Sequence, residues 1–209
     1  MIAVLALLAP LGCGIQTGVG AILNELKPAP GAVVAVFGTG AVGLGALMAA
    51  GLTGATRIVA VDIVPSRLEL ARALGATDTV NSAETDPVEA LHAISGGIGI
   101  QTAVDTTGVP QVQTQALEAL APRGSLGLIG LRLGANFTAP GRTLLHGLTV
   151  RGIIEGDSDI VTFLPALVDL VRQGRLPLEK IVREYPLDAI DQAAADSATG
   201  KTIKPVIRF

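Results

Sequence analysis

Short apolar runs alternate along this chain with longer stretches in which apolar residues recur at helical spacing. Runs rich in Val, Ile and Ala are typical of buried strands, and a period near 3.6 predicts helices that cover a sheet. Their alternation predicts βαβ units, and therefore a parallel sheet with helices on both faces. The predicted strands are 32–37, 57–62, 79–81, 101–105, 125–129 and 148–154, and the predicted helices are 41–52, 65–74, 86–95 and 110–120.

The pattern changes after residue 157. A helix is predicted over 160–173, with Pro165 inside it, and a strand over 180–185. A helix over 188–197, with Asp188 as its N-cap, and a strand over 203–209 follow. No internal repeat or low-complexity linker divides the chain, and a Gly- and Pro-rich loop covers 130–142. We therefore expect one α/β domain over 28–157, flanked by segments 1–27 and 158–209.

The first fifteen residues, MIAVLALLAPLGCGI, are strongly apolar. A secretory signal has a basic start, whereas the first basic residue here is Lys27. A membrane helix needs about 20 apolar residues, and Pro10 and Gly12 interrupt this run earlier. We favour a buried segment at a domain edge over a targeting or membrane-spanning role.

Composition narrows the class of protein. The chain has 209 residues, a net charge of −3, 49% apolar and 16% charged residues, and this balance excludes intrinsic disorder. The acidic balance and the 2% of aromatic residues argue against a nucleic-acid partner. The single cysteine, Cys13, excludes a disulfide framework and favours a reducing, cytoplasmic location.

A glycine motif joins the first predicted strand to the helix after it. Residues 38–43, Gly38-Thr39-Gly40-Ala41-Val42-Gly43, match the spacing G-x-G-x-x-G. In a dinucleotide-binding turn the first glycine makes the tight turn, the second admits the pyrophosphate and the third allows the helix to pack on the strand. The helix N-terminus then offers free N–H groups to the phosphates. This context predicts dinucleotide binding; the alternative is a tight strand–helix turn alone.

Asp62 ends the second predicted strand, 19 residues after Gly43. A carboxylate there accepts hydrogen bonds from the adenosine ribose and repels a 2′-phosphate, so NAD is favoured over NADP. Arg67 lies close enough in sequence to touch a 2′-phosphate if the loop rearranged; otherwise it flanks the adenosine ribose or is a solvated helix residue. The alternative is a solvated loop acid followed by a surface arginine.

The ends of later strands carry further candidates. Thr106 and Thr107 follow strand 101–105, and Ile129, Gly130 and Leu131 end strand 125–129. Ligands of open α/β sheets bind outside the carboxyl ends of the strands. We expect these residues to border the nicotinamide end of the dinucleotide, although ordinary turn chemistry explains the glycine equally well.

The segment G-C-G-x-x-T-G at residues 12–18 adds a specific resemblance. Together with 38–43, 61–62, 67–71, 106–110, 151–157 and 200–206, it resembles the medium-chain zinc-dependent alcohol dehydrogenases over essentially the whole chain. The stretch Glu155-Gly156-Asp157 and the closing Lys-Thr-Ile-Lys-Pro-Val are most similar to the aryl (benzyl-type) subgroup. The resemblance implies a Rossmann-type doubly wound sheet of six parallel strands.

The resemblance also implies roles for particular residues. Cys13 matches a ligand of the catalytic zinc, Thr17 a residue against the nicotinamide, and Lys204 a basic position near the pyrophosphate. In this family zinc lowers the pKa of a bound alcohol so that hydride passes to NAD. A small alcohol or aldehyde substrate is implied, as is a homodimer or tetramer joined through the sixth strand, with no membrane partner.

The chain departs from the family in one large respect. Family members carry a catalytic domain ahead of this region, with the remaining zinc ligands and the proton relay, and His92 and His146 match no ligand position. We expect residues 1–27 to be a linking segment from that domain and 158–209 to return to it. The apolar faces of residues 2–15 and 175–209 are then expected to be exposed or loosely folded. Zinc is expected to bind only in the complete protein, and the chain alone is expected to be inactive.

Two other functions stay open. A zinc-free quinone or enoyl reductase has a similar sheet, but such relatives generally lack the cysteine that Cys13 provides. The chain is alternatively a non-catalytic NAD-binding module, or a subunit complemented by a separate catalytic chain.

Overall fold

Six parallel strands form the central sheet of the computed structural model, which describes residues 2–209, with side chains from residue 5 onward. The strand order is β3-β2-β1-β4-β5-β6. The strands are β1 (Val33–Phe37), β2 (Arg57–Asp62), β3 (Asp78–Asn81), β4 (Ile100–Asp105), β5 (Leu120–Leu128) and β6 (Thr149–Gly152). The order reverses between β1 and β4, which is the position where doubly wound sheets bind ligands. The predicted sheet is confirmed.

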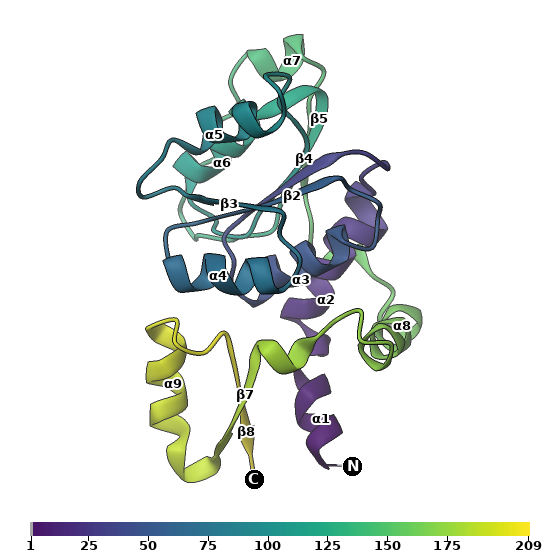
Figure 1. The fold of residues 1–209 in the computed structure, drawn as a ribbon, viewed down its shortest axis with the longest axis vertical. Helices are drawn as coiled ribbons and strands as arrows, with labels where there is room; N and C mark the ends of the chain where they lie inside the picture. Colours follow the sequence, from purple (N-terminus) through teal and green to yellow (C-terminus); the bar gives the residue numbers. More distant parts are fainter. Residues whose placement is uncertain (1) are drawn as a thin grey trace.

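Helices cover both faces of this sheet (Figure 1). On one face lie α3 (Ala41–Ala50) and α4 (Pro65–Ala73), and on the other lie α5 (Pro87–Ile94) and α6 (Pro110–Glu118). Side chains alternate across β1 accordingly. Val34 and Val36 join the core beneath α3, whereas Ala35 and Phe37 join the core beneath α6. All four are at most 1% exposed, so β1 is buried on both faces.

The start of β5 differs from the prediction. Pairing begins where Leu120 meets Ile100, and a bulge separates this pair from the regular register that starts at Ser125. Arg123 has φ +66° inside the bulge and Gly124 follows it. The sequence Pro-Arg-Gly resembles a turn, and pairing with β4 keeps it in the sheet. The short helix α7 (Arg142–Leu145) was also not predicted.

The N-terminal segment is helical and largely buried. It comprises α1 (Ile2–Leu8), a 3₁₀ turn (Ala9–Gly12), α2 (Gly14–Gly20) and a π-helical stretch (Ala21–Leu26). Leu11 and Ile15 belong to the core, which corrects the expectation of an exposed apolar face, whereas Leu5 is 65% exposed. Helix α2 approaches α3 so closely that a Cβ on Gly18 would lie 1.9 Å from the carbonyl oxygen of Val42.

Among the described helices, none alone is long and apolar enough to cross a membrane. The pair Leu5–Gly12 and Gly14–Leu26, bent by 60°, meets the length and composition requirement only when both parts are taken together.

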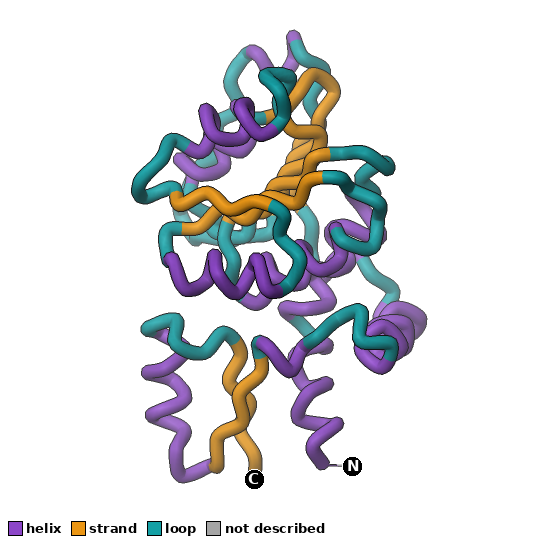
Figure 2. Tube along the Cα trace, in the orientation of Figure 1, coloured by secondary structure: helices purple, strands orange, loops and turns teal. Residues whose placement is uncertain are grey.

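The C-terminal region is folded, which corrects the expectation of a loose tail. It contains α8 (Ile160–Arg172), β7 (Val182–Pro186), α9 (Ile190–Ala198) and β8 (Lys204–Arg208), with β7 and β8 paired in parallel. Figure 2 shows this two-stranded sheet apart from the six-stranded one. Leu176, Leu178 and Ile181 join the main core, although Leu187 and Ile190 are about half exposed. Asp188 lies in a 3₁₀ turn ahead of α9 and is not its N-cap.

A polar network holds β7, α9 and β8 together. The Tyr185 hydroxyl donates to Asp196 Oδ2 at 2.7 Å and lies 2.7 Å from Thr202 Oγ1. Gln192 and Lys201 donate to the other carboxylate oxygen. The hydrogen bond from Tyr185, followed by those from Gln192 and Lys201, holds the pKa of Asp196 below its ordinary value although burial opposes the shift.

Candidate functional site

The turn between β1 and α3 requires glycine at its first position. Gly38 has φ +87°, a conformation that L side chains rarely adopt. A Cβ on Gly38 would lie 2.6 Å from Thr106 Oγ1, at the end of β4. The Gly38 N–H donates to the Val61 carbonyl at 2.8 Å. The turn is therefore fixed against both neighbouring strands.

The other two glycines of the motif differ in their surroundings. A Cβ on Gly43 would lie 1.9 Å from the Gly38 carbonyl oxygen, so α3 packs directly on the turn. A Cβ on Gly40 would meet nothing within 4 Å. Gly40 is the N-cap of α3 and provides no side-chain cap. The start of α3 therefore has no side-chain cap and borders open space at Gly40, an arrangement suited to a phosphate.

Asp62 lies at the end of β2 beside this turn, with 7% of its surface exposed. Its Oδ2 accepts hydrogen bonds from the Thr39 N–H and hydroxyl, both at 2.7 Å. Its Oδ1 accepts from the N–H groups of Ile63 and Val64, at 2.8 and 3.0 Å. Each carboxylate oxygen thus has two donors, which is about its full capacity. The carboxylate is held rigidly at the mouth of the turn.

The end of β4 closes the other side. Asp105 is fully buried and accepts from the N–H groups of Thr107 and Gly108, the Thr107 hydroxyl and the Gln113 amide. Thr106 Oγ1 lies 3.0 Å from the carbonyl oxygens of both Phe37 and Gly38. Asp105 organises this strand end, and the two threonines meet the glycine turn.

A cavity of about 450 Å³ opens between these strand ends. It brings together eight of the sequence-predicted residues: Gly38, Gly40, Ala41, Val42, Asp62, Arg67, Thr106 and Thr107. The volume is in the range of small-molecule sites. Sequence reasoning missed further lining residues, namely Phe37, Val61, Ile63, Ser82, Val109, Val112 and Gln115. Val109 is the N-cap of α6 and Val112 lies in its first turn, shortly after β4 ends at Asp105, and this position near a strand's carboxyl end was the available signal.

Other predicted residues lie behind or away from the cavity. Thr39 and Gly43 support its wall through Asp62 and Gly38. Gly130 packs against Gly108, and Leu131 is 82% exposed. Ile129 donates its N–H to the Asp105 carbonyl, and Lys204 lies in β8, where its N–H donates to the Ile181 carbonyl. The residues Ile129, Gly130, Leu131 and Lys204 do not line this cavity.

A second polar cluster surrounds Cys13, which is exposed. Its Sγ lies 4.0 Å from Glu155 Oε1. Glu155 Oε2 accepts from Gln16 Nε2 at 3.3 Å and from Thr17 Oγ1 at 3.4 Å. Glu155 has φ +48°, and the next residue, Gly156, packs against α2. The structure thus brings Cys13 and Thr17 together and adds Glu155, which is 142 residues from Cys13 in sequence.

The described residues do not suffice for a catalytic zinc. Zinc in such sites takes about three protein ligands. Within residues 2–209 no group of three or more His, Cys, Asp or Glu side chains could hold a metal ion. His92 Nε2 lies 3.4 Å from the Glu118 carbonyl oxygen, and His146 lies beside the exposed helix α7. Cys13 and Glu155 alone leave a zinc site incomplete.

The sheet order, the glycine turn and the acid at the end of β2 define a Rossmann-type α/β domain. Residues 41–170 match the family model described as zinc-binding dehydrogenase, and the chain belongs to this family, the medium-chain zinc-dependent alcohol dehydrogenases. It corresponds to the cofactor-binding part of these proteins.

Curated relatives are similar over nearly the whole chain. A geraniol dehydrogenase of Castellaniella defragrans is 41% identical over 98% of this chain and 56% of its own length. An alcohol dehydrogenase 1 of Trifolium repens is 38% identical over 95% of this chain and 53% of its own length. The chain therefore spans about half the length of the curated relatives it matches.

Solved structures agree closely with the fold. A benzyl alcohol dehydrogenase of Acinetobacter calcoaceticus superposes with a TM-score of 0.95 at 46% identity, covering 98% of this chain and 57% of the other. An alcohol dehydrogenase zinc-binding domain protein of Burkholderia ambifaria gives a TM-score of 0.94 at 52% identity, covering 98% and 55%.

Proposed function

We propose that the chain binds NAD in the cavity at the ends of β1, β2 and β4, as the cofactor-binding part of an alcohol dehydrogenase. The observation that carries this proposal is the open space at Gly40, the N-cap of α3, which has no side-chain cap and lines the cavity together with Ala41 and Val42. A pyrophosphate there receives N–H donors and the positive end of the helix dipole. Bound NAD supplies the hydride acceptor of an alcohol oxidation.

Each wall of the cavity has a part in this binding. The adenine lies among the apolar side chains of Ile63, Val109 and Val112. The ribose lies at Asp62, whose charge disfavours a 2′-phosphate and so selects NAD over NADP. Since both oxygens of Asp62 already accept two hydrogen bonds, the Thr39 hydroxyl has to release Asp62 when a ribose hydroxyl binds. Arg67 flanks the ribose from α4.

We propose that the nicotinamide end of the dinucleotide extends out of this cavity toward Thr17, and that Ile129, Gly130 and Leu131, which lie outside the cavity, border it there. For Lys204, which also lies outside the cavity, the position near the pyrophosphate rests on the family resemblance alone. We propose that the zinc site is complete only when further ligands, beyond the residues described here, join Cys13. The chain alone is therefore expected to oxidise little alcohol. The substrates proposed are aryl alcohols and aldehydes, supported by 46% identity to a benzyl alcohol dehydrogenase. We also propose a homodimer or tetramer that pairs through β6, because the outer edge of β6 has no partner strand in the described sheet. The proposed location is cytoplasmic.

A fluorescence titration with NADH, in parallel with NADPH, tests this function. We expect saturable NADH binding and at least about tenfold weaker NADPH binding, because a like-charge contact at 4 Å costs between about 1 kcal/mol in bulk water and about 4 kcal/mol near a protein surface, and about 1.4 kcal/mol is tenfold. The variant Asp62→Asn removes the charge and keeps the shape, so it should narrow the difference between the two cofactors. Asp78→Asn, an acid on the neighbouring strand outside the cavity, is the matched control. A chain that melts cooperatively and ignores NADH contradicts the proposal.

A further inference from the structure

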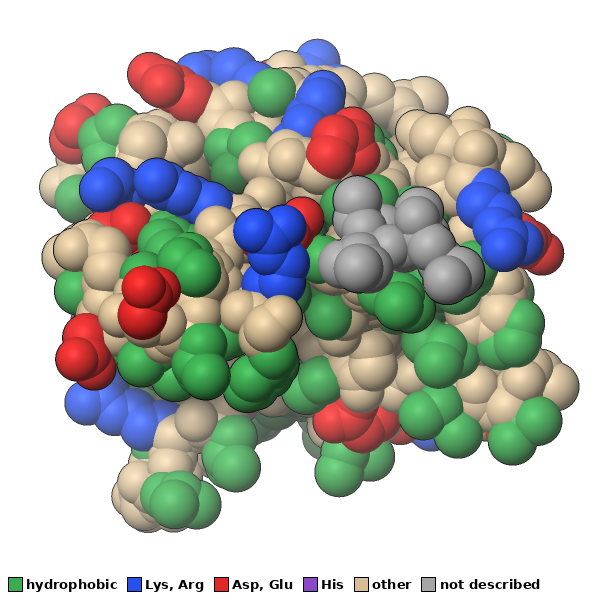
Figure 3. Space-filling model, turned by 90° about the horizontal axis from the view of Figure 1, so that it is seen from below, with side chains coloured by type: hydrophobic (Ala, Val, Ile, Leu, Met, Phe, Trp, Pro, Cys, Tyr) green, Lys and Arg blue, Asp and Glu red, His purple; other side chains and the backbone are tan. Residues whose placement is uncertain are grey.

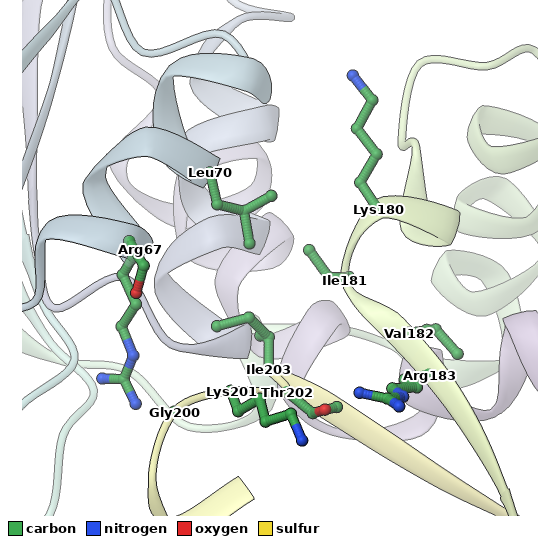
Figure 4. A pocket seen from close by; sticks show the side chains of 11 residues that line it. Arg67, Leu70, Lys180, Ile181, Val182, Arg183, Gly200, Lys201, Thr202 and Ile203 are labelled. Atoms are coloured by element: carbon green, nitrogen blue, oxygen red, sulfur yellow. The ribbon is translucent and has the colours of Figure 1, made fainter. Parts of the chain in front are cut away.

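A second cavity, of about 580 Å³, lies between α4 and the β7–β8 sheet. Figure 4 shows its walls: Arg67 and Leu70 from α4 on one side, and the segments around Ile181 and Ile203 on the other. Ile181 is 3% exposed, and Leu70 and Ile203 are partly buried, so the floor is apolar. This cavity is separate from the dinucleotide cavity except for Arg67, which lines both.

The rim of the second cavity is basic. Arg67, Lys180, Arg183 and Lys201 line it, and among the described residues that line it none carries a carboxylate. Lys180 Nζ donates to the Ala73 carbonyl at 3.0 Å, and Figure 4 shows it turned away from the other three. Seen from the side of the tail (Figure 3), Lys and Arg side chains lie among apolar and acidic ones on this face of the molecule. The cavity thus combines an apolar floor with a cationic rim.

The cations of the rim are incompletely neutralised. Lys201 Nζ and Arg183 Nη1 share one carboxylate, Asp196, at 3.2 and 3.7 Å. Asp196 is buried, and Tyr185 and Gln192 also donate to it. Among the ion pairs of the described residues, Asp196 is the partner of both Lys201 and Arg183, and neither Arg67 nor Lys180 has a carboxylate partner. The four rim cations therefore pair with a single carboxylate.

Arg67 provides the second observation. Its Nε is buried and has no hydrogen-bond partner, and no ion pair of Arg67 is found within residues 2–209. The guanidinium packs over the Gly200 turn, where a Cβ would lie 3.1 Å from Nη2. A side chain on that turn would crowd the guanidinium at the entrance of the cavity. A buried donor of a charged group without a partner favours a bound anion.

We propose that this cavity binds a small organic anion, with a carboxylate or phosphate group held by Arg67, Arg183 and Lys201 and an apolar body against Leu70, Ile181 and Ile203. The planar guanidinium suits both groups because it offers paired donors to two oxygens. The proposal does not depend on NAD binding, since its floor and two of its three cations lie outside the dinucleotide cavity.

Calorimetric or NMR titrations of the 209-residue chain with benzoate, phenyl phosphate and benzamide test it. Benzamide has nearly the shape of benzoate but no charge. We expect benzoate or phenyl phosphate to bind at least about tenfold more tightly than benzamide, because hydrogen bonds to charged groups are the stronger ones. Preference for phenyl phosphate over benzoate identifies a phosphate ligand, and the reverse identifies a carboxylate. Equal binding of benzoate and benzamide overturns the proposal.

The variants Arg183→Gln and Lys201→Gln locate the site, because neither residue lines the dinucleotide cavity. Together they should weaken anion binding about tenfold or more and leave NADH binding unchanged. The pair Arg132→Gln and Arg175→Gln removes the same charge from exposed positions outside the cavity and should change nothing. If the double variant does not melt cooperatively, Lys201→Gln is compared with Lys201→Arg, which should retain binding. If none of these rim variants lowers the affinity for the anion, the anion binds elsewhere and the proposed site is wrong.

Discussion

The six-stranded sheet and the β7–β8 unit are held together by different kinds of contact. Between α3 and α6, β1 is buried on both faces, and apolar side chains such as Phe37, Leu117 and Leu126 are at most 1% exposed. The β7–β8 unit is centred on one polar network, around Asp196, while Leu187, Ile190 and Phe209 remain exposed. The first arrangement gains its stability mainly from burial, and the second from directional hydrogen bonds that one substitution can remove.

The largest expected effect comes from the glycine turn. Gly43→Val places a side chain where even a Cβ would lie 1.9 Å from the Gly38 carbonyl oxygen. Because backbone would have to move, we expect a loss of about 4 kcal/mol of unfolding free energy and no NADH binding. Denaturant unfolding and the NADH titration check this. Gly141→Val, at a loop glycine whose Cβ meets nothing within 4 Å, is the control. A Gly43 variant that binds NADH normally would show that α3 does not need this close approach.

Truncating a core side chain should destabilise the six-stranded sheet as a whole. Leu126→Ala removes a fully buried side chain on β5, for an expected loss of about 3 kcal/mol. Hydrogen exchange should accelerate throughout β1, β4 and β5, since these strands share one core. Leu133→Ala, at a loop position 88% exposed, serves as the control and should have little effect. Faster exchange confined to β5 would contradict the prediction that the sheet unfolds as one cooperative unit.

A milder change should loosen the β7–β8 unit alone. Tyr185→Phe removes the hydroxyl that donates to Asp196 and contacts Thr202. Leaving these buried partners short of a hydrogen bond costs about 1–2 kcal/mol. Hydrogen exchange should rise in β7, α9 and β8, with the six-stranded sheet unchanged. Phe209→Leu, at a residue 97% exposed, is the matched aromatic control. Equal acceleration in both regions would mean that they unfold together.

The smallest expected effect is that of acid, which should destabilise the β7–β8 unit and leave the six-stranded sheet unchanged. Since hydrogen bonds hold the pKa of folded Asp196 below its unfolded value, its stabilisation is complete above the unfolded value. It is lost as the pH falls through the lower folded value, so the loss begins below about pH 4. Exchange or tyrosine fluorescence should report loosening around Tyr185 in this range. Asp196→Asn should abolish this pH dependence, and a persistent acid transition in that variant would assign it to other carboxyl groups.

Local pattern predicted most of the sheet and missed particular places. The strands around Val34 and Val59 were found because continuous apolar runs signal burial on both faces. The start of β5 was missed because Pro122, Arg123 and Gly124 resemble a turn, and only the pairing of Leu120 and Ser125 with β4 on either side of this bulge keeps them in the strand. The helices and strands of the tail were predicted, but their packing was missed because its apolar residues meet partners from α4 and the N-terminal helices, which no local pattern reports.

Some residues of the candidate site were likewise predicted from the sequence, and others were not. Gly38, Gly40, Asp62 and Thr106 were predicted from strand ends and line the cavity. Lys204, assigned by resemblance, lies outside it. The contact of Glu155 with Cys13 spans 142 residues of chain, so spacing carries no signal for it.

The sequence by itself determined the order of strands and helices, the glycine turn and the acid at the end of β2, because strand burial, positive φ and helix starts depend on residues close in the chain. The tertiary structure alone decided that Arg67 meets Gly200, that Lys201 and Arg183 share Asp196, and that Glu155 joins Cys13. These contacts join residues whose mutual distance is set by how the helices pack on the two sheets, and that packing depends on the whole core.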